Sequence, residues 1–350
     1  MPETSGPIPA VGGMLCSPAL HTLPVCGKAT GIERAPRDMS PSILQNARLS
    51  PELERTLAGE FRVHPLWQEK DAPAFLARHG GEFTGLVTTA PVGASAALID
   101  ALPNLKVIAS RGVGYDTIAL DRARSRGILV AYTPGVLTDC VADLAFGALI
   151  AAARGLCAAD RFVRRGDWQR GRFGMTTRVS GKRLGILGLG AIGRTIAKRA
   201  SGFDMEVRYH NRSAVPDVPY VREPSLLELA RWADFLVVAC SGGPETRHLV
   251  SAKVIAALGP EAFLVNVSRG TVVDEPVLVD ALVNKRIAGA ALDVYEREPH
   301  VPEALLALDN VVLLPHVSSS SRETFAAMEA LVLENLRRYF AEGKVVTPVA

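Results

Sequence analysis

Short runs of apolar residues alternate with helix-like patterns along the first half of the chain. Residues 86–88, 106–109 and 128–131 are such runs, and they flank helical patterns such as residues 94–101. Short apolar runs separated by helices are typical of buried parallel strands, because a parallel pair of strands needs a crossover connection. This part of the chain therefore predicts βαβ units and a parallel sheet.

Six further apolar runs repeat this pattern in the second half. They span residues 183–187, 205–209, 235–239, 263–267, 288–292 and 311–314, with helical patterns between them. Together the two sets predict an α/β fold with two doubly wound parallel-sheet domains of the Rossmann or flavodoxin type. Ligands of such sheets bind at the carboxyl ends of the strands, so we expect the active site in the cleft between the domains.

Two helix patterns set the expected domain limits. One runs from about Thr138 to Arg165 and is long enough to connect two domains, and the other runs from Arg322 to Phe340 after the last predicted strand. If this last helix returns to the first sheet, residues 42–140 plus 317–350 form a substrate domain and residues 141–316 a dinucleotide-binding domain. Residues 1–41 lack apolar periodicity and are expected to be a loose extension without a signal peptide, and a start at Met39 stays open.

Composition narrows the class of protein. The 350 residues suffice for two domains, and 39 Lys and Arg against 36 Asp and Glu leave a formal charge of only +3, so no nucleic-acid partner is expected. Five scattered cysteines favour a reduced, cytoplasmic location and predict no metal site. The longest apolar stretch, residues 141–159, contains Asp143 and Arg154, so we expect a core helix and no membrane span.

A glycine-rich turn, Gly188-Leu189-Gly190-Ala191-Ile192-Gly193, stands between a predicted strand and a predicted helix. In this context the spacing predicts dinucleotide binding. Gly188 allows the tight turn, Gly190 leaves room for the pyrophosphate beside the backbone, and Gly193 lets the helix pack closely on the strand. The amino end of the helix then faces the phosphates.

The end of the next strand predicts which dinucleotide is preferred. Sites selective for NAD usually have an acidic residue there to bind the ribose 2′-hydroxyl, but this strand ends in His210-Asn211-Arg212-Ser213. Arg212 can pair with a 2′-phosphate, and Asn211 and Ser213 can hydrogen-bond it. We therefore expect NADP(H) to be preferred, with NAD(H) as a possible cofactor. Alternatively, Arg212 is an ordinary surface arginine.

Three polar residues follow successive predicted strands: Arg269, Glu298 and His316. Reduction of a 2-oxo acid needs a cation for the carboxylate or carbonyl, an acid that protonates the oxygen, and a group that keeps this acid protonated. Arginine, histidine and glutamate meet these needs in turn. Taken alone, each has an ordinary structural interpretation: His316 can be a surface residue, and Arg269 can cap the helix near Glu275.

Seven motifs together resemble the D-isomer-specific 2-hydroxyacid dehydrogenase family from about residue 42 onward. They are the glycine-rich turn, Gly112-Val113-Gly114-Tyr115-Asp116, Thr133-Pro134-Gly135-Val136-Leu137-Thr138 with Val141-Ala142-Asp143, Asn266-Val267-Ser268-Arg269-Gly270, Ala291-Leu292-Asp293-Val294-Tyr295, Glu298-Pro299 and Pro315-His316. Within the family, the chain looks most like the glyoxylate/hydroxypyruvate and hydroxyphenylpyruvate reductases.

The resemblance implies roles for the candidate residues. It makes His316 the proton donor, Glu298 its partner, and Arg269 the residue that binds and polarises the substrate, with the backbone amides of Val113 and Gly114 on its carboxylate. Relatives commonly have Gly or Ala where this chain has Ser318, so the hydroxyls that follow His316, that of Ser319 among them, are expected to alter the substrate contacts.

The resemblance also implies a cofactor site. Leu189, Gly190, Ala191 and Ile192 would meet the pyrophosphate, and Asn211, Arg212 and Ser213 the adenosine ribose. The remaining cofactor residues would be Cys240, Val267, Ser268 and Asp293. Of these, Asp293 would bond the nicotinamide carboxamide, although a buried Asp after a strand can instead cap a loop.

Partners and alternative functions follow from the same resemblance. Trp168 and the arginines around it resemble the dimer-forming arm of the family, so we expect a homodimer. The expected activity is NADPH-dependent reduction of a small 2-oxo acid of the glyoxylate, hydroxypyruvate or hydroxyphenylpyruvate type to the D-2-hydroxy acid. A dinucleotide-sensing regulatory protein and a phosphoglycerate-type dehydrogenase stay open as alternatives, whereas Glu298 argues against a formate dehydrogenase, which has glutamine there.

Overall fold

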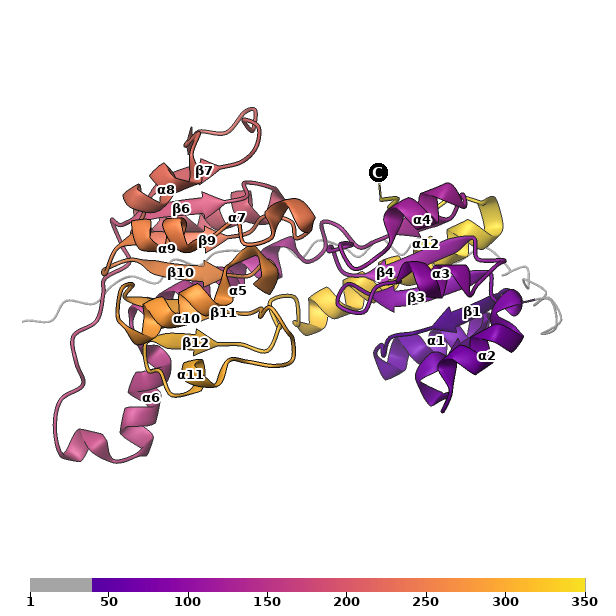
Figure 1. Ribbon diagram of the computed structural model, residues 1–350, viewed down its shortest axis with the longest axis horizontal. Helices are drawn as coiled ribbons and strands as arrows, with labels where there is room; N and C mark the ends of the chain where they lie inside the picture. Colours follow the sequence, from indigo (N-terminus) through magenta and orange to yellow (C-terminus); the bar gives the residue numbers. More distant parts are fainter. Residues whose placement is uncertain (1–39, 350) are drawn as a thin grey trace, which may run out of the picture. The chain divides into compact units, whose positions relative to one another are not determined.

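The computed structural model describes residues 40–349, so nearly all of the expected N-terminal extension lies outside the described residues. The first half of the described chain forms a five-stranded sheet in which all neighbours are parallel (Figure 1). Its spatial order, β2-β1-β3-β4-β5, is that of flavodoxin-like sheets. The strands are β1 (Ser42–Gln45), β2 (Arg62–Pro65), β3 (Gly85–Thr89), β4 (Val107–Arg111) and β5 (Leu129–Ala131).

Helices cover both faces of this sheet, because side chains alternate along each strand. On one face Ile43, Val87 and Val107 pack with Leu57 of α1 and with Leu336 of the last helix, α12. On the other face β1, β3 and β4 present Leu44, Leu86 and Ile108 to residues of α3 and α4. The helices are α1 (Pro51–Glu60), α2 (Ala72–His79), α3 (Ala96–Asp100), α4 (Leu120–Ser125) and α12 (Arg322–Glu342).

The second half forms a seven-stranded parallel sheet with the order β12-β11-β10-β9-β6-β7-β8. The strand order reverses between β6 and β9, which is where doubly wound sheets bind their ligands. The strands are β6 (Arg183–Leu187), β7 (Glu206–His210), β8 (Val221–Arg222), β9 (Phe235–Val238), β10 (Phe263–Asn266), β11 (Gly289–Leu292) and β12 (Val311–Leu313).

This sheet also has an apolar core on each face. Ile186, Val237 and Val265 pack with residues of α5 and α7, and Leu236 and Leu264 face the opposite core. The two sheets confirm the predicted fold class. The helices are α5 (Thr138–Ala153), α6 (Leu156–Arg164), α7 (Ala191–Ala200), α8 (Leu226–Trp232), α9 (Ala252–Leu258), α10 (Glu275–Val283) and α11 (Glu303–Leu306).

The single helix predicted from Thr138 to Arg165 is wrong. The chain forms two helices, α5 and α6, which are bent by 59° with respect to each other. Gly155 lies at the break with a φ of +57°, a left-handed conformation that ends a helix and that glycine adopts at little cost. Within residues 40–349 no single helix meets the length and hydropathy of a membrane span, although the bent pair α5 and α6 does so jointly.

The last helix, α12, follows β12 of the seven-stranded sheet but packs against β4 of the five-stranded sheet. Figure 1 shows it in yellow beside the purple strands β3 and β4. Val332 and Leu336 of α12 are almost fully buried in the same core as Ile43 and Val107. The described chain therefore crosses to the seven-stranded sheet and returns, while the domain limits at residues 140 and 316 stay a prediction.

Candidate active site

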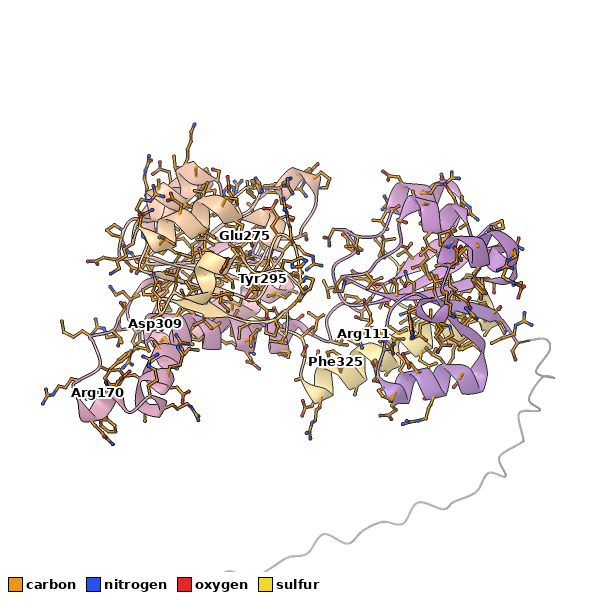
Figure 2. All side chains as sticks on the ribbon, turned by 60° about the horizontal axis from the view of Figure 1, so that its bottom comes forward. Arg111, Arg170, Glu275, Tyr295, Asp309 and Phe325 are labelled. Carbon is orange, nitrogen blue, oxygen red and sulfur yellow. The ribbon has the colours of Figure 1, made fainter. Side chains whose placement is uncertain are left out.

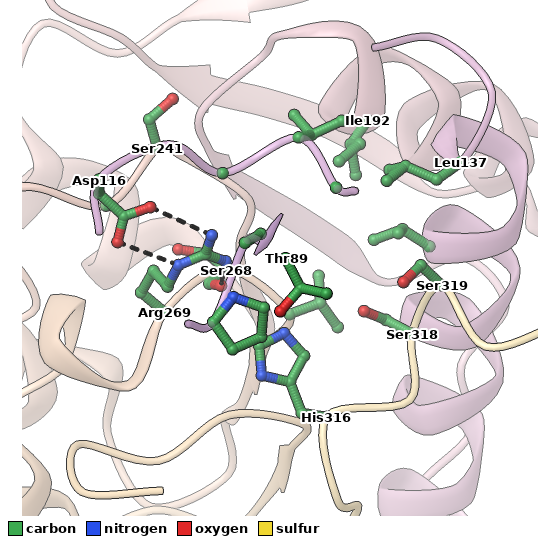
Figure 3. A pocket seen from close by; sticks show the side chains of 18 of the residues that line it. Thr89, Asp116, Leu137, Ile192, Ser241, Ser268, Arg269, His316, Ser318 and Ser319 are labelled. Carbon is green, nitrogen blue, oxygen red and sulfur yellow. Dashed lines mark hydrogen bonds and ion pairs between the residues drawn. The ribbon is translucent and has the colours of Figure 1, made fainter. Parts of the chain in front are cut away.

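The carboxyl ends of three neighbouring strands carry the three residues expected to do the chemistry. Arg269 follows β10, Glu298 follows β11, and His316 follows β12. All three line one cavity of about 340 Å³, to which the ends of β3 and β4 and the start of α12 also contribute (Figure 3). Val113, Gly114 and Ser319, which were expected to contact the substrate, line the same cavity.

The imidazole of His316 is held by Glu298. Its Nδ1 lies 2.7 Å from Oε2 of Glu298, so Nε2 is the nitrogen left for a ligand. The backbone of His316 has a φ of +56°, an unusual value for a residue other than glycine and one that is often found at functional sites. The backbone N–H of His316 donates to the carbonyl of Asp293 at 2.8 Å.

Asp293 shapes the turn that carries His316. Its two carboxylate oxygens accept hydrogen bonds from the backbone N–H groups of Val317 and Ser318, at 2.8 and 2.9 Å. Because Asp293 is almost fully buried, these two bonds compensate for the loss of water around the carboxylate. The loop-capping role is therefore present, and the expected contact with a nicotinamide carboxamide stays a prediction.

The charge of Glu298 depends on His316. Burial raises the pKa of Glu298, but the hydrogen bond and the positive charge of His316 outweigh burial, so its pKa lies below the ordinary value of 4.5. The backbone N–H of Tyr295 also donates to Oε1 of Glu298, at 3.2 Å, and favours the ionised form. Glu298 is thus an anion at neutral pH and can stabilise a protonated imidazole.

Arg269 is held by a residue that the sequence had not singled out. Its Nε and Nη2 donate to the two carboxylate oxygens of Asp116, at 3.2 and 3.1 Å, and its Nη1 donates to the carbonyl of Ser268 at 2.8 Å (Figure 3). A fork-to-fork pair of this kind fixes the plane of the guanidinium. Arg269 therefore does not cap the helix near Glu275.

Two glycines leave the space that Arg269 fills. A Cβ at Gly114 would lie 1.5 Å from Nη2 of Arg269, and a Cβ at Gly242 would lie 2.5 Å from its Cγ. The backbones on both sides thus touch the side chain directly. Three of the five N–H groups of the guanidinium are engaged by Asp116 and Ser268, which leaves one on Nη1 and one on Nη2 for a ligand.

The loop after β4 offers further donors to the cavity. Among the described residues, the backbone N–H groups of Val113 and Gly114 donate no hydrogen bond, and both residues line the cavity. Two neighbouring free amides beside an arginine form a suitable site for a carboxylate. The geometry is thus compatible with the predicted role of Val113 and Gly114.

The glycine-rich turn fits a dinucleotide. A Cβ at Gly188, whose φ is +98°, would lie 2.5 Å from the backbone nitrogen of Cys240, and a Cβ at Gly193 would lie 2.1 Å from the carbonyl oxygen of Gly188. By contrast, a Cβ at Gly190 would have no atom within 4 Å. Gly188 and Gly193 are therefore required by the fold, whereas Gly190 keeps open the space before the amino end of α7, where a pyrophosphate would bind.

Hydrogen bonds hold Asn211 and Arg212, the two residues that follow β7, in place. Oδ1 of Asn211 accepts the backbone N–H of Leu189 at 2.7 Å, which ties this strand end to the glycine-rich turn. Arg222 donates to the backbone carbonyls of both Asn211 and Arg212. The side chain of Arg212 is exposed and pairs with Glu245, so it is oriented at the surface next to the turn.

Four of the expected cofactor residues line the cavity: Ile192, Cys240, Val267 and Ser268. Burial raises the pKa of the Cys240 thiol, so the thiol is not activated as a nucleophile. The other expected cofactor residues lie outside the cavity; they are Gly188, Leu189, Gly190, Ala191, Gly193, Asn211, Arg212, Ser213 and Asp293.

Sequence reasoning missed three polar residues of the site. Asp116 stands in the motif that begins at Gly112, which was recognised for its backbone only, and Thr89 and Arg111 end β3 and β4. The places of Thr89 and Arg111 at the carboxyl ends of parallel strands are a signal that could have identified these two residues. Between residues 40 and 349 there is no group of three or more His, Cys, Asp or Glu side chains arranged to hold a metal ion.

Comparison with known proteins agrees with this geometry. Residues 146–318 match the family model of the NAD binding domain of D-isomer specific 2-hydroxyacid dehydrogenases. A hydroxyphenylpyruvate reductase of Plectranthus scutellarioides is 46% identical over 307 residues, which are 88% of this chain and 98% of that protein. A glyoxylate/hydroxypyruvate reductase A of Arabidopsis thaliana is 46% identical over 310 residues, 89% of this chain and 99% of that protein.

A solved structure is similar over the same length. The NADPH-dependent glyoxylate/hydroxypyruvate reductase of Sinorhizobium meliloti, in complex with NADP and malonate, superposes with a TM-score of 0.82 at 39% sequence identity. The match covers 89% of this chain and 97% of that one. A match of this length extends over both sheets.

Proposed function

The chain belongs to the D-isomer specific 2-hydroxyacid dehydrogenase family, and from this premise we propose that it reduces a small 2-oxo acid to the D-2-hydroxy acid with NADPH as the preferred cofactor. It is an NAD(P)-dependent oxidoreductase. The observation that carries the proposal is the hydrogen-bonded pair of His316 and Glu298, which lines one cavity with Arg269 and with the free amides of Val113 and Gly114. Glyoxylate, hydroxypyruvate and hydroxyphenylpyruvate are the substrate types that the names of the relatives support.

In this proposal the residues divide the work between binding and proton transfer. The amides of Val113 and Gly114 bind the carboxylate together with one of the two N–H groups that Arg269 has left for a ligand, and the other N–H group polarises the carbonyl. The bound nicotinamide supplies a hydride to the carbonyl carbon. Nε2 of His316 gives its proton to the carbonyl oxygen, and the anion of Glu298 stabilises the imidazole in its protonated form before this transfer.

The NADP preference rests on Arg212 and on the absence of an acid at the end of β7. Arg212 is exposed at that strand end beside Asn211 and Ser213, where a 2′-phosphate would add two negative charges. The NADPH-dependent structural relative supports the same preference.

The proposal is tested by the activity of His316→Ala. We expect wild-type protein to oxidise NADPH in the presence of at least one of glyoxylate, hydroxypyruvate and hydroxyphenylpyruvate, followed by absorbance of the reduced nicotinamide. His316→Ala should lower kcat by about a hundredfold or more, because it removes the proton donor, and should leave the Kd of NADPH close to that of the wild type.

His300→Ala is the matched control, because this exposed histidine does not line the cavity. NADPH binding without turnover of any acid would contradict the proposal and favour the dinucleotide-sensing alternative. Turnover only with a 2-oxo acid whose 3-hydroxyl is phosphorylated would favour the phosphoglycerate-type alternative instead.

We further propose a cytoplasmic homodimer. The proposal of a dimer is supported by the segment from α6 to residue 175, which exposes Leu156, Val163, Trp168 and Met175. A monomeric mass by light scattering would contradict the dimer, and recovery of the protein in a membrane or secreted fraction would contradict the location.

A further inference from the structure

The wall of the cavity formed by the five-stranded sheet carries two polar side chains that the proposed reaction does not use. Thr89 ends β3 and Arg111 ends β4, and the two residues are register partners in neighbouring strands. Side chains of register partners point to the same face of a sheet. Both residues line the same cavity as His316, and Figure 3 labels Thr89 and His316 among its lining residues.

Arg111 is fixed in place by α12. Its Nη1 donates to Oε1 of Glu329 at 2.8 Å, and its Cζ lies 4.4 Å from the centroid of the Phe325 ring. Figure 2 shows Arg111 and Phe325 close together. Glu329 is itself almost fully buried and accepts the backbone N–H of Ser50 at 3.1 Å. The guanidinium is thus immobilised on two sides, and its charge is neutralised by one buried carboxylate.

Both side chains retain unused hydrogen-bonding capacity. Among the described residues, Nη1 is the only nitrogen of Arg111 that donates a hydrogen bond, and the hydroxyl of Thr89 makes none. A rigid donor and a hydroxyl are therefore available to a ligand in the cavity that His316 also lines. Such preorganised groups distinguish ligands that differ by a single hydroxyl, because the ligand without it leaves them unpaired.

We propose that Thr89 and Arg111 form a subsite for a hydroxyl on C3 of the substrate, so that the chain favours 3-hydroxy-2-oxo acids over those with an apolar C3. The inference rests on the proposed function, because the carboxylate must be held at Arg269 for the side chain to extend elsewhere. In the view of Figure 3, Arg269 and Asp116 lie to the left of Thr89 and His316.

The same pair argues against an anionic substituent. Arg111 is already paired with Glu329, so a second carboxylate or a phosphate on the substrate would meet no net positive charge and would approach a buried anion. A neutral hydroxyl can accept a hydrogen bond from Arg111 and exchange one with Thr89 without this cost. The subsite thus favours hydroxypyruvate over 2-oxo acids whose 3-hydroxyl is phosphorylated.

The test compares hydroxypyruvate with pyruvate, which differ by the C3 hydroxyl alone. We expect wild-type kcat/KM to favour hydroxypyruvate by about tenfold or more, as the loss of one or two hydrogen bonds implies. Thr89→Val keeps the side-chain volume and removes only the hydroxyl, so it should lower this ratio several-fold. Arg111→Met with Glu329→Gln should lower it as well, without leaving a buried charge unpaired.

Thr56→Val is the matched control. The hydroxyl of Thr56 bonds the carbonyl of Glu52 on α1, away from the cavity, so this variant should keep the wild-type ratio. Equal use of pyruvate and hydroxypyruvate by the wild type, or an unchanged ratio in Thr89→Val, overturns the subsite. Glyoxylate has no C3, so its reduction tests the proposed function without the subsite. If glyoxylate is reduced but hydroxypyruvate is not preferred over pyruvate, the subsite alone is refuted. If no acid is reduced, the proposed function is refuted as well.

Discussion

Two arginines expected to bind anionic ligands are paired with carboxylates of the chain itself. Arg269 holds Asp116 through two hydrogen bonds, and Arg212 pairs with Glu245. The first pair is partly buried and leaves two N–H groups of Arg269 for a ligand, so Asp116 orients the guanidinium without using all of it. The second pair is exposed, and a phosphate with two negative charges competes well against a surface carboxylate.

Arg212→Ala should therefore change the choice of cofactor. Because NADPH alone carries the 2′-phosphate, we expect the ratio of kcat/KM with NADPH to that with NADH to fall by about tenfold or more. Steady-state kinetics with both cofactors measure this ratio. Arg231→Ala is the matched control, since Arg231 also makes an exposed ion pair, with Glu228 on α8. An unchanged ratio in Arg212→Ala would contradict the proposed NADP preference.

Glu298 should contribute to stability in a pH-dependent way. Its pKa is lowered in the folded protein, so the contribution of the ionised side chain is fully present above the ordinary value of 4.5 and is lost as the pH falls through the lower folded value. The difference in free energy of unfolding between the wild type and Glu298→Gln should therefore shrink as the pH falls below 4.5. Urea unfolding over a pH series measures it, and a difference that grows in acid would contradict the direction of the shift.

The positions of the three candidate catalytic residues and the pairing of Glu298 with His316 could be predicted from the sequence, whereas the pairing of Asp116 with Arg269 could not. Arg269, Glu298 and His316 each follow an apolar run, and parallel strands bring their carboxyl ends to one edge of the sheet. Asp116 belongs to the other sheet, and its pairing with Arg269 depends on how two separate sheets approach each other. A linear pattern of apolar residues contains no information on that approach.

Elements were predicted well where they are long and apolar and poorly where they are short or interrupted. The edge strands β2 and β8 were missed, because Arg62–Pro65 and Val221–Arg222 are partly exposed and have no continuous apolar run. The break between α5 and α6 was missed for the opposite reason, since the apolar pattern continues across Gly155. The conformation of one glycine decides the direction of α6, and periodicity does not report it.

The turn between β6 and α7 allows a matched pair of substitutions. Gly193→Ala places a Cβ against the carbonyl of Gly188 and should lower the Tm, because α7 must move away from β6. Gly190→Ala meets no atom and should keep a Tm near that of the wild type, but its methyl group occupies the space of the pyrophosphate and should weaken NADPH binding by about tenfold or more. Thermal unfolding and fluorescence titration measure the two effects. Equal losses of Tm in both variants would refute the distinction.

At the scale of the whole molecule, the five-stranded sheet depends on a helix that is distant in sequence. Leu336 of α12 is fully buried against residues of β1, β3 and β4. The face of the sheet that binds α12 would otherwise expose Ile43, Val87 and Val107 to water.

Leu336→Ala should therefore lower the free energy of unfolding by about 2–5 kcal/mol, the usual cost of a cavity in a well-packed core. Leu306→Ala, at an exposed position of α11, should change it by less than about 0.5 kcal/mol. Urea unfolding followed by circular dichroism measures both values. A small effect of Leu336→Ala would mean that α12 is not required to complete the sheet.

The return of α12 also imposes an order of assembly during synthesis. Strands β1 to β5 leave the ribosome first, but the apolar face that packs on α12 stays uncovered until residues 322–342 emerge. The seven-stranded sheet has all its strands by residue 313, so the dinucleotide half can fold while the earlier half is still incomplete. A nascent chain at that stage exposes an open, apolar sheet, which is the kind of surface that chaperones bind and that aggregates when they do not.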